Sequence, residues 1–215
     1  MRKTLTKKAR LFTLGLFLTA MTLSGCLKDG DDTIVLPLPD GKIPYSVIPR
    51  DLQDSLRRHG FLINEGLEPP IINGHYLGSP MDLDYASDNV GLNFVDVDMT
   101  FSKQLERGLI KYVEKQLTPN GGTMTSEFEE ANIIGSDGKF TVYTWQYDNG
   151  TNVDSTNWRV KIATLVSGTL ASGGIKDCQY AVLVLEKEND EFNRIPETNT
   201  FRIYHDGDNL AVTLE

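Results

Sequence analysis

The stretch Val95-Asp96-Val97-Asp98-Met99-Thr100-Phe101 alternates between apolar and polar residues at every step. Because successive side chains of a β-strand point to opposite faces of the sheet, this period of two predicts a strand with one buried face and one solvated face. The same alternation occurs at residues 81–85 and 158–162. From Ile71 onward, we therefore expect the chain to be almost entirely β-sheet.

Residue pairs that favour tight turns separate these runs: Asn120-Gly121, Asp137-Gly138, Asn149-Gly150, Gly173-Gly174 and Asp206-Gly207. Each pair can supply the positive φ that a two-residue hairpin turn requires. We expect nine or ten strands, with successive strands paired, at about residues 72–78, 80–87, 92–103, 108–117, 122–134, 139–148, 154–170, 175–187, 198–205 and 209–214. A sheet this wide leaves two exposed edges unless it closes, so the predicted fold is an all-β, up-and-down antiparallel β-barrel.

A short helix is predicted ahead of the strands, at Pro49 to His59. Leu52 and Leu56 are one turn apart, and Gly60 follows as a stop signal. A helix of about three turns is not stable alone, so we expect it to pack against an edge or an end of the domain.

Residues 104–117 allow two interpretations. Leucine or valine recurs every four residues from Leu105 to Leu117, which is typical of a helix. Gly108 and the Tyr112-Val113 pair favour a strand instead. We favour the strand.

The first 25 residues have the composition of a signal peptide. Met1 to Arg10 carries five positive charges, and Leu11 to Leu23 is a mostly apolar run of 13 residues. This run is shorter than the roughly 20 residues that a transmembrane helix needs. It ends in Leu23-Ser24-Gly25-Cys26, which resembles the lipobox of bacterial lipoproteins. The resemblance implies that residues 1–25 are removed and that an acylated Cys26 holds the mature chain at a membrane.

The residues after Cys26 indicate where that membrane is. Lys28 is followed by a run of acids, which resembles the signal that exports lipoproteins of Bacteroides-type bacteria to the outer face of the outer membrane. The resemblance implies a lipid-anchored protein exposed on the cell surface. Residues 26–43 contain two prolines and no hydrophobic periodicity, and they are expected to be a disordered tether. Residues 44–215 are enough for a single domain.

The charge of the mature chain argues against nucleic-acid binding. Residues 1–25 hold five of the 21 Lys and Arg residues and none of the 30 Asp and Glu residues, which leaves 16 positive and 30 negative side chains, a formal charge of −14. Such a chain repels phosphate backbones. With Cys26 acylated, Cys178 has no intramolecular disulfide partner. Its position in an alternating run makes it a small buried hydrophobic residue rather than a nucleophile.

A second resemblance begins at Gly74-His75-Tyr76. This motif follows the predicted short helix and opens the first strand, and it resembles the Gly-x-Trp motif of lipocalins and the wider calycin group. The resemblance implies that the ring of Tyr76 closes the barrel floor and that Arg202, from a late strand, packs over it. Over residues 44–213, including 135–142 and 174–181, the chain is similar to uncharacterised lipocalin-like lipoproteins of gut Bacteroides. That group implies a fold and a location but no activity.

No catalytic, metal or cofactor site is predicted. Asp82 with Asp84, and Asp96 with Asp98, are two residues apart and therefore fall on the solvated faces of strands. The Gly-x-Ser-x-Gly motif of a nucleophilic serine is absent from the sequence. An enzyme would need a buried acid pair that no sequence pattern reveals, and we expect a protein that is not an enzyme. The histidines, which are not at metal-ligand spacing, are His59, His75 and His205.

The candidate ligand-binding residues are Tyr143, Trp145 and Tyr147, which share one face of their strand, opposite Phe140 and Val142. Aromatic side chains line cavities or stack on sugars, although most are core residues. We predict that the barrel binds a small apolar or amphipathic molecule in a hollow interior of a few hundred Å³. The alternative is a glycan- or protein-binding accessory module of an outer-membrane complex, which an exposed aromatic row would favour.

Overall fold

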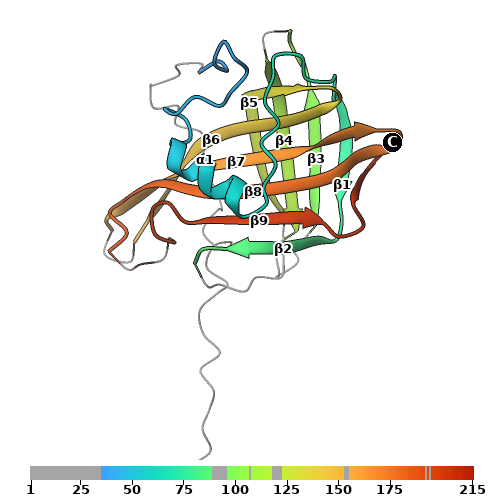
Figure 1. Cartoon of the computed structure of the whole chain (residues 1–215). Coiled ribbons are helices and arrows are strands. Elements are labelled where there is room, and N and C mark those ends of the chain that lie inside the picture. The colour runs from blue at the N-terminus through green and yellow to red at the C-terminus, as the bar shows by residue number, and fades with distance from the viewer. Residues whose placement is uncertain are drawn as a thin grey trace, which may run out of the picture.

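The computed structural model describes residues 35–88, 96–106, 108–117, 123–152, 155–191, 193 and 195–215. Within them, ten antiparallel strands form one sheet, and one short helix precedes the strands (Figure 1). The predicted mostly antiparallel β fold with a short N-terminal helix is confirmed. The signal peptide, Cys26 and the predicted Asn120-Gly121 turn lie outside the described residues. No helix in the described part of the chain is long and apolar enough to cross a membrane.

The helix, α1, is Arg50–Arg58. The strands are β1 Gly74–Gly78, β2 Met81–Ala86, β3 Val97–Ser102, β4 Leu109–Leu117, β5 Thr123–Ser136, β6 Lys139–Thr151, β7 Asn157–Ala171, β8 Gly174–Glu188, β9 Phe201–Asp206 and β10 Leu210–Thr213. The strand interpretation of residues 104–117 is confirmed for β4. Residues 103–105 have no regular structure.

The predicted turn at Asn149-Gly150 is wrong, because β6 continues through both residues. They pair with Arg159 and Trp158 of β7. A Cβ atom on Gly150 would lie 2.3 Å from a ring carbon of Trp158, so this glycine makes room for the indole ring and does not form a turn. The Asp137-Gly138 turn is confirmed: both residues have positive φ, between β5 and β6.

The strand order is β10-β1-β3-β4-β5-β6-β7-β8-β9-β2, and β10 also pairs with β8. Strands β1, β3 to β8 and β10 therefore form a closed ring of backbone hydrogen bonds, from which β9 and β2 branch. In Figure 1, β1, β3 and β4 run crosswise to β6–β9. The prediction that all successive strands pair is wrong: β1 pairs with β3, and β2 pairs with β9. The branch forms because β8 pairs first with β10 and then with β9 along one edge.

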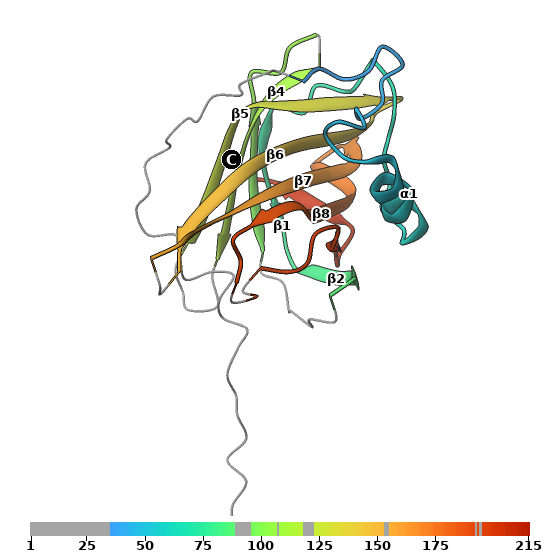
Figure 2. The same cartoon turned by 90° about the vertical axis from the view of Figure 1, so that its left-hand side faces the viewer.

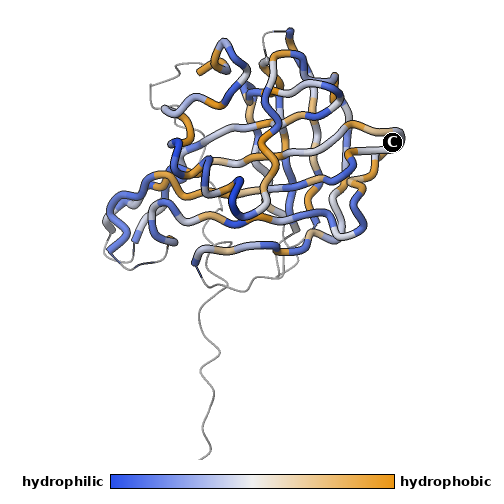
Figure 3. Tube along the Cα trace, in the orientation of Figure 1, coloured by the Kyte–Doolittle hydropathy of each residue, from blue (hydrophilic) through white to orange (hydrophobic). Residues whose placement is uncertain are grey.

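The sheet is buried on both faces where it meets α1. Inside the ring, Tyr112, Phe140 and Tyr180 belong to one apolar cluster. Outside it, Leu52 and Leu56 of α1 pack in a second cluster with residues of β7, β8 and β9. Figure 3 shows hydrophobic residues (orange) interspersed with hydrophilic ones (blue) along the strands. The helix thus lies on a face of the sheet (Figure 2), not at the edge or end that its length led us to expect.

The domain begins before residue 44, so the predicted tether is wrong at its C-terminal end. Ile43 is fully buried in the outer cluster, and Val35 packs against that cluster. The buried side chain of Gln53 donates hydrogen bonds to the carbonyl oxygens of Ile43 (3.1 Å) and Ile48 (2.8 Å). Gly66 N also donates to Gly41 O at 3.0 Å. The apolar residues around the prolines therefore complete the core.

Candidate functional site

One half of the ring interior is filled with aromatic side chains. The register of β3, β4 and β5 places Phe101, Tyr112 and Phe128 side by side. The ring centroids of Phe101 and Tyr112 are 4.9 Å apart, those of Tyr112 and Phe128 are 5.7 Å apart, and both pairs are stacked. All three side chains are buried. As far as the described side chains extend, this half of the interior is packed core.

In the other half of the interior, strands β4, β5 and β6 present polar side chains. Because side chains of a strand alternate between its faces, the residues that continue the interior face of β4, β5 and β6 can be assigned. We call them the polar end of the ring: Glu114, Gln116, Ser126, Thr144, Gln146 and Asp148. Beyond the pair Asn132–Tyr143, β5 and β6 no longer pair, and they diverge in Figure 2. Ser126, Gln146 and Asp148 are half-buried, so solvent reaches the polar end.

Glu114 is the centre of a hydrogen-bond network at the polar end. Its Oε2 atom accepts hydrogen bonds from the hydroxyls of Tyr112 (2.8 Å) and Tyr180 (3.0 Å). Gln116 Nε2 donates to the Tyr180 hydroxyl at 3.0 Å. Glu114 is only 4% exposed.

Burial dominates the electrostatics of this network. It raises the pKa of Glu114, the neighbouring carboxyl of Asp148 raises it further, and the tyrosine hydroxyls act in the opposite direction. Burial also raises the pKa of Asp148. These partners of Glu114 are hydroxyls and a second carboxyl, and none of them is a cation. Removing a carboxyl from water without a cationic partner costs free energy.

The predicted aromatic row is divided between core and surface. Tyr143, Trp145 and Tyr147 share one face of β6, opposite Phe140 and Val142, as predicted. That face is the outer one, so the three rings do not line the interior in which a ligand was expected. Tyr143 is fully buried under the outer cluster, whereas Trp145 and Tyr147 are half-buried.

Cations cover the two half-buried rings. The guanidinium carbon of Arg159 lies 3.6 Å from the ring centroid of Tyr147. Lys161 Nζ lies 4.8 Å from the ring centroid of Trp145. The indole and phenol rings meet edge to face, with centroids 5.7 Å apart. The surface is therefore an aromatic pair with cations over it, not a flat row of three rings.

The predicted barrel-floor residues have other described contacts. Tyr76 is buried, donates to Ile72 O at 3.2 Å and packs against Phe101. A Cβ atom on Gly74 would lie only 2.8 Å from the Tyr76 hydroxyl, so a residue without a side chain is needed at position 74. Arg202 forms an ion pair with Asp88, and both side chains are mostly buried. The packing of Arg202 over Tyr76 stays a prediction.

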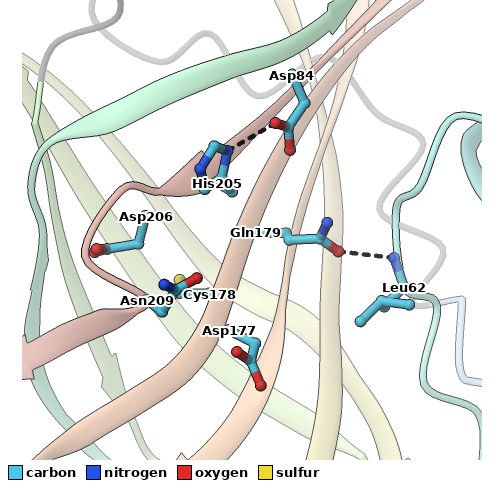
Figure 4. A pocket seen from close by; sticks show the side chains of 8 residues that line it. All are labelled: Leu62, Asp84, Asp177, Cys178, Gln179, His205, Asp206 and Asn209. Atoms are coloured by element: carbon cyan, nitrogen blue, oxygen red, sulfur yellow. Dashed lines mark hydrogen bonds and ion pairs between the residues drawn. The ribbon is translucent and has the colours of Figure 1, made fainter.

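A pocket of about 250 Å³ opens where β8 changes partners (Figure 4). Lys176 pairs with β10 and Gln179 with β9, so the two residues between them leave a fork in the sheet. Gln179 Oε1 accepts from Leu62 N at 2.8 Å, which ties the segment after α1 to the rim. We call this the fork pocket; it is lined by Leu62, Asp84, Asp177, Cys178, Gln179, His205, Asp206 and Asn209.

The thiol of the fork pocket is not activated as a nucleophile. Cys178 is fully buried, and burial together with Asp206 raises its pKa to about 12, so the thiol stays protonated. This confirms its prediction as a buried residue. His205 Nδ1 lies 2.7 Å from Asp84 Oδ1. Among the described residues, no three His, Cys, Asp or Glu side chains gather as a metal ion would require.

Asp206, at the fork pocket, links two separate segments of the chain by hydrogen bonds. Its Oδ2 atom accepts from Ser79 N and its Oδ1 atom from Asp208 N, both at 3.2 Å. Burial raises its pKa to about 6, and the hydrogen bond with Asp208 acts in the same direction. The carboxyl therefore fastens the β9–β10 turn to the β1–β2 connection.

Comparisons of the chain with protein-family models, curated proteins and solved structures give no match.

Glu114 was missed at the level of sequence, although a signal for it exists. Ile110, Tyr112 and Glu114 are two residues apart on one strand, so an acid continues an apolar face. Asp206 had no such signal, because its hydrogen-bond partner Ser79 is 127 residues away in the sequence.

Proposed function

We propose that this chain is a lipid-anchored lipoprotein of the outer membrane, displayed on the cell surface and binding a small amphipathic molecule without chemical conversion. The anchor is Cys26, supported by the signal-peptide pattern, the lipobox and the acidic residues that follow. The described domain begins nine residues later, at Val35. We interpret the closed ring as a lipocalin-like barrel, supported by its crosswise strands and the preceding helix.

The anchor is tested by growing cells with a labelled palmitate analogue. Label is expected in the wild-type protein and in Cys178→Ala, and none in Cys26→Ser. Protease treatment of intact cells then tests display, because a surface protein is digested and a periplasmic one is protected. Label that persists in Cys26→Ser contradicts the anchor.

The observation that carries the binding proposal is the buried carboxyl of Glu114. A structure stabilised by packing alone would place an apolar residue at this position, since burying an acid without a cation is costly. Buried groups with shifted pKa values occur preferentially at functional sites. A hydrogen-bond donor or ammonium group on a ligand would offset the cost.

The same geometry limits the size of the apolar part of the ligand. The stack of Phe101, Tyr112 and Phe128 occupies the far half of the interior, so a long chain has no room there. The ligand is expected to enter at the polar end, where β5 and β6 diverge. Its polar group then meets Glu114, and its apolar part lies over Met124, which is half-buried beside Gln116.

Binding is tested with a fluorescent medium-chain alkylamine and the matched fatty acid. We expect the amine to bind and the acid not to bind, because Glu114 and Asp148 repel a carboxylate. Glu114→Gln is expected to weaken amine binding, whereas Glu130→Gln, an exposed acid on β5, is the control. Equal binding by wild-type and Glu114→Gln proteins contradicts the proposal.

A second candidate function is recognition of a glycan or a protein on the outer surface. The observation that favours it is the half-buried Trp145 and Tyr147 pair with Arg159 and Lys161 over the rings. Aromatic and arginine side chains together are typical of binding surfaces. Loss of binding to a glycan array or to an outer-membrane extract in Trp145→Ala, with alkylamine binding unchanged, would support this function.

A further inference from the structure

Four aliphatic side chains are exposed at one end of the domain. Leu36 is 43% exposed, Leu67 59%, Ile71 66% and Leu105 49%. Together they expose about as much apolar surface as two fully exposed leucine residues. We call these four residues the loop patch. Single exposed aliphatic residues are common, whereas a group of them marks an interaction surface.

Hydrogen bonds and close packing bring the loops of this patch together. Gln104, next to Leu105, donates from Nε2 to Pro70 O, and its Oε1 atom accepts from Ile72 N, both at 2.9 Å. These bonds place Leu105 near Ile71, which lies between the two bonded residues.

The N-terminal segment joins the same end of the domain. Pro37, next to Leu36, packs on Gly108, where a Cβ atom would lie 3.1 Å from its ring. Gly66, next to Leu67, bonds to Gly41. In Figures 1 and 2, the segments that carry the four residues lie at one end, above the sheet.

The start of the described domain is also at this end. Leu36 follows Val35 directly, and Val35 is nine residues after Cys26. Nine residues span at most about 30 Å when fully extended. A compact domain of this size is about 40 Å across. A lipid on Cys26 therefore favours orientations in which the loop patch is the part of the domain nearest the bilayer.

We propose that the loop patch rests on the lipid surface and inserts its four aliphatic side chains at the boundary between headgroups and acyl chains. The inference depends on the proposed anchor at Cys26. The lipid is recognised through its apolar chains, since the charges around the patch are of both signs. They are Asp40, Lys42, Glu68, Lys103 and Glu106. Attraction to anionic headgroups would require a basic surface, which the loop patch lacks. Lipids with no net charge are therefore sufficient for the proposed insertion.

The test uses the mature lipidated protein in phosphatidylcholine vesicles that contain phosphatidylcholine with a nitroxide on its acyl chain. An environment-sensitive fluorophore is attached to Leu105→Cys in the loop patch, or to Thr123→Cys as an exposed control at the far end of β5. Cys178 is buried and its thiol is protonated, so it does not compete for the label. The emission of the label at position 105 is expected to shift to shorter wavelength and to be quenched by the nitroxide. The emission of the label at position 123 is expected to show neither change.

A second variant tests the apolar side chains. Leu67→Ser with Ile71→Ser changes only exposed positions and is expected to reduce quenching at position 105 to the level at 123, while the protein still sediments with vesicles. Sedimentation with neither label quenched overturns the inference and leaves the anchor intact. A protein that does not sediment contradicts the anchor, and the inference with it. Dimerisation through the patch, seen as a doubled mass in detergent with position 105 unquenched in vesicles, also overturns it.

Discussion

Asp206→Asn is expected to flatten the dependence of stability on pH between about pH 4 and pH 7. Burial raises the pKa of Asp206 from 3.8 to about 6. Between these two values the folded protein holds the proton more tightly than the unfolded chain, so the free energy of unfolding falls as the pH rises. The stabilisation by the protonated carboxyl is complete below the unfolded pKa and is lost as the pH passes the folded pKa.

The size of the effect follows from the two pKa values. A carboxyl whose pKa rises on folding from 3.8 to about 6 lowers the free energy of unfolding by about 2 kcal/mol as the pH rises from 4 to 7. Asp208 acts in the opposite direction, because its hydrogen bond with Asp206 lowers its pKa. The stability that Asp208 contributes is present above its unfolded pKa and is lost as the pH falls. The free energy of unfolding is therefore expected to fall between pH 4 and pH 7 by about 1 to 2 kcal/mol less in Asp206→Asn than in the wild-type protein.

The assay is urea unfolding at pH 4, 5.5 and 7, followed by the fluorescence of Trp145 and Trp158. Asp177→Asn is the matched control, because this exposed acid of the same pocket has positive φ, which asparagine also tolerates. Asparagine at 206 has one acceptor oxygen instead of two, so absolute stability is expected to fall. The change with pH is the informative quantity. An unchanged pH dependence in Asp206→Asn would refute the reasoning.

Three further substitutions test the core. Gly74→Ala places a Cβ atom 2.8 Å from the Tyr76 hydroxyl, and we expect urea unfolding to show a loss of about 1 to 3 kcal/mol. Tyr143→Phe removes a buried hydroxyl that has no described partner, and thermal unfolding should show unchanged or slightly higher stability, by up to about 1 kcal/mol. Arg202→Met removes the cation that pairs with the buried Asp88 carboxylate and is expected to lower the free energy of unfolding by about 3 kcal/mol. In a double-mutant cycle, adding Asp88→Asn to Arg202→Met is expected to recover part of this loss.

The strands were predictable from sequence because one buried face imposes a period of two on neighbouring residues. The alternation at Met99 and Phe101 is sufficient for β3, and the apolar residues of β8 reveal a strand buried on both faces. Asn149-Gly150 misled the prediction because its local signal is identical to that of a hairpin turn. Only the indole of Trp158, on the next strand, shows that the glycine is needed for packing.

The pairing of strands could not be predicted from the sequence, because a strand's partner can be far away along the chain and no local pattern identifies it. Nothing near Lys176 shows that β8 pairs with β10 up to this residue and with β9 from Gln179 onward. The fork pocket and the burial of Asp206 follow from that change of partner. The proposed anchor residue, Cys26, is the opposite case, since its signal is wholly local and the described domain does not include it.

The two proposed contacts of the domain constrain each other. Strand β4 begins at Leu109, near the loop patch, and passes Glu114 toward its other end. The polar end of the ring therefore lies opposite the loop patch. If the patch rests on the outer membrane, the opening where β5 and β6 diverge faces the medium, from which an amphipathic molecule would arrive. A ligand extracted from the bilayer would need the opposite orientation. Quenching at position 123 in place of position 105 would therefore indicate a protein that takes its ligand from the membrane.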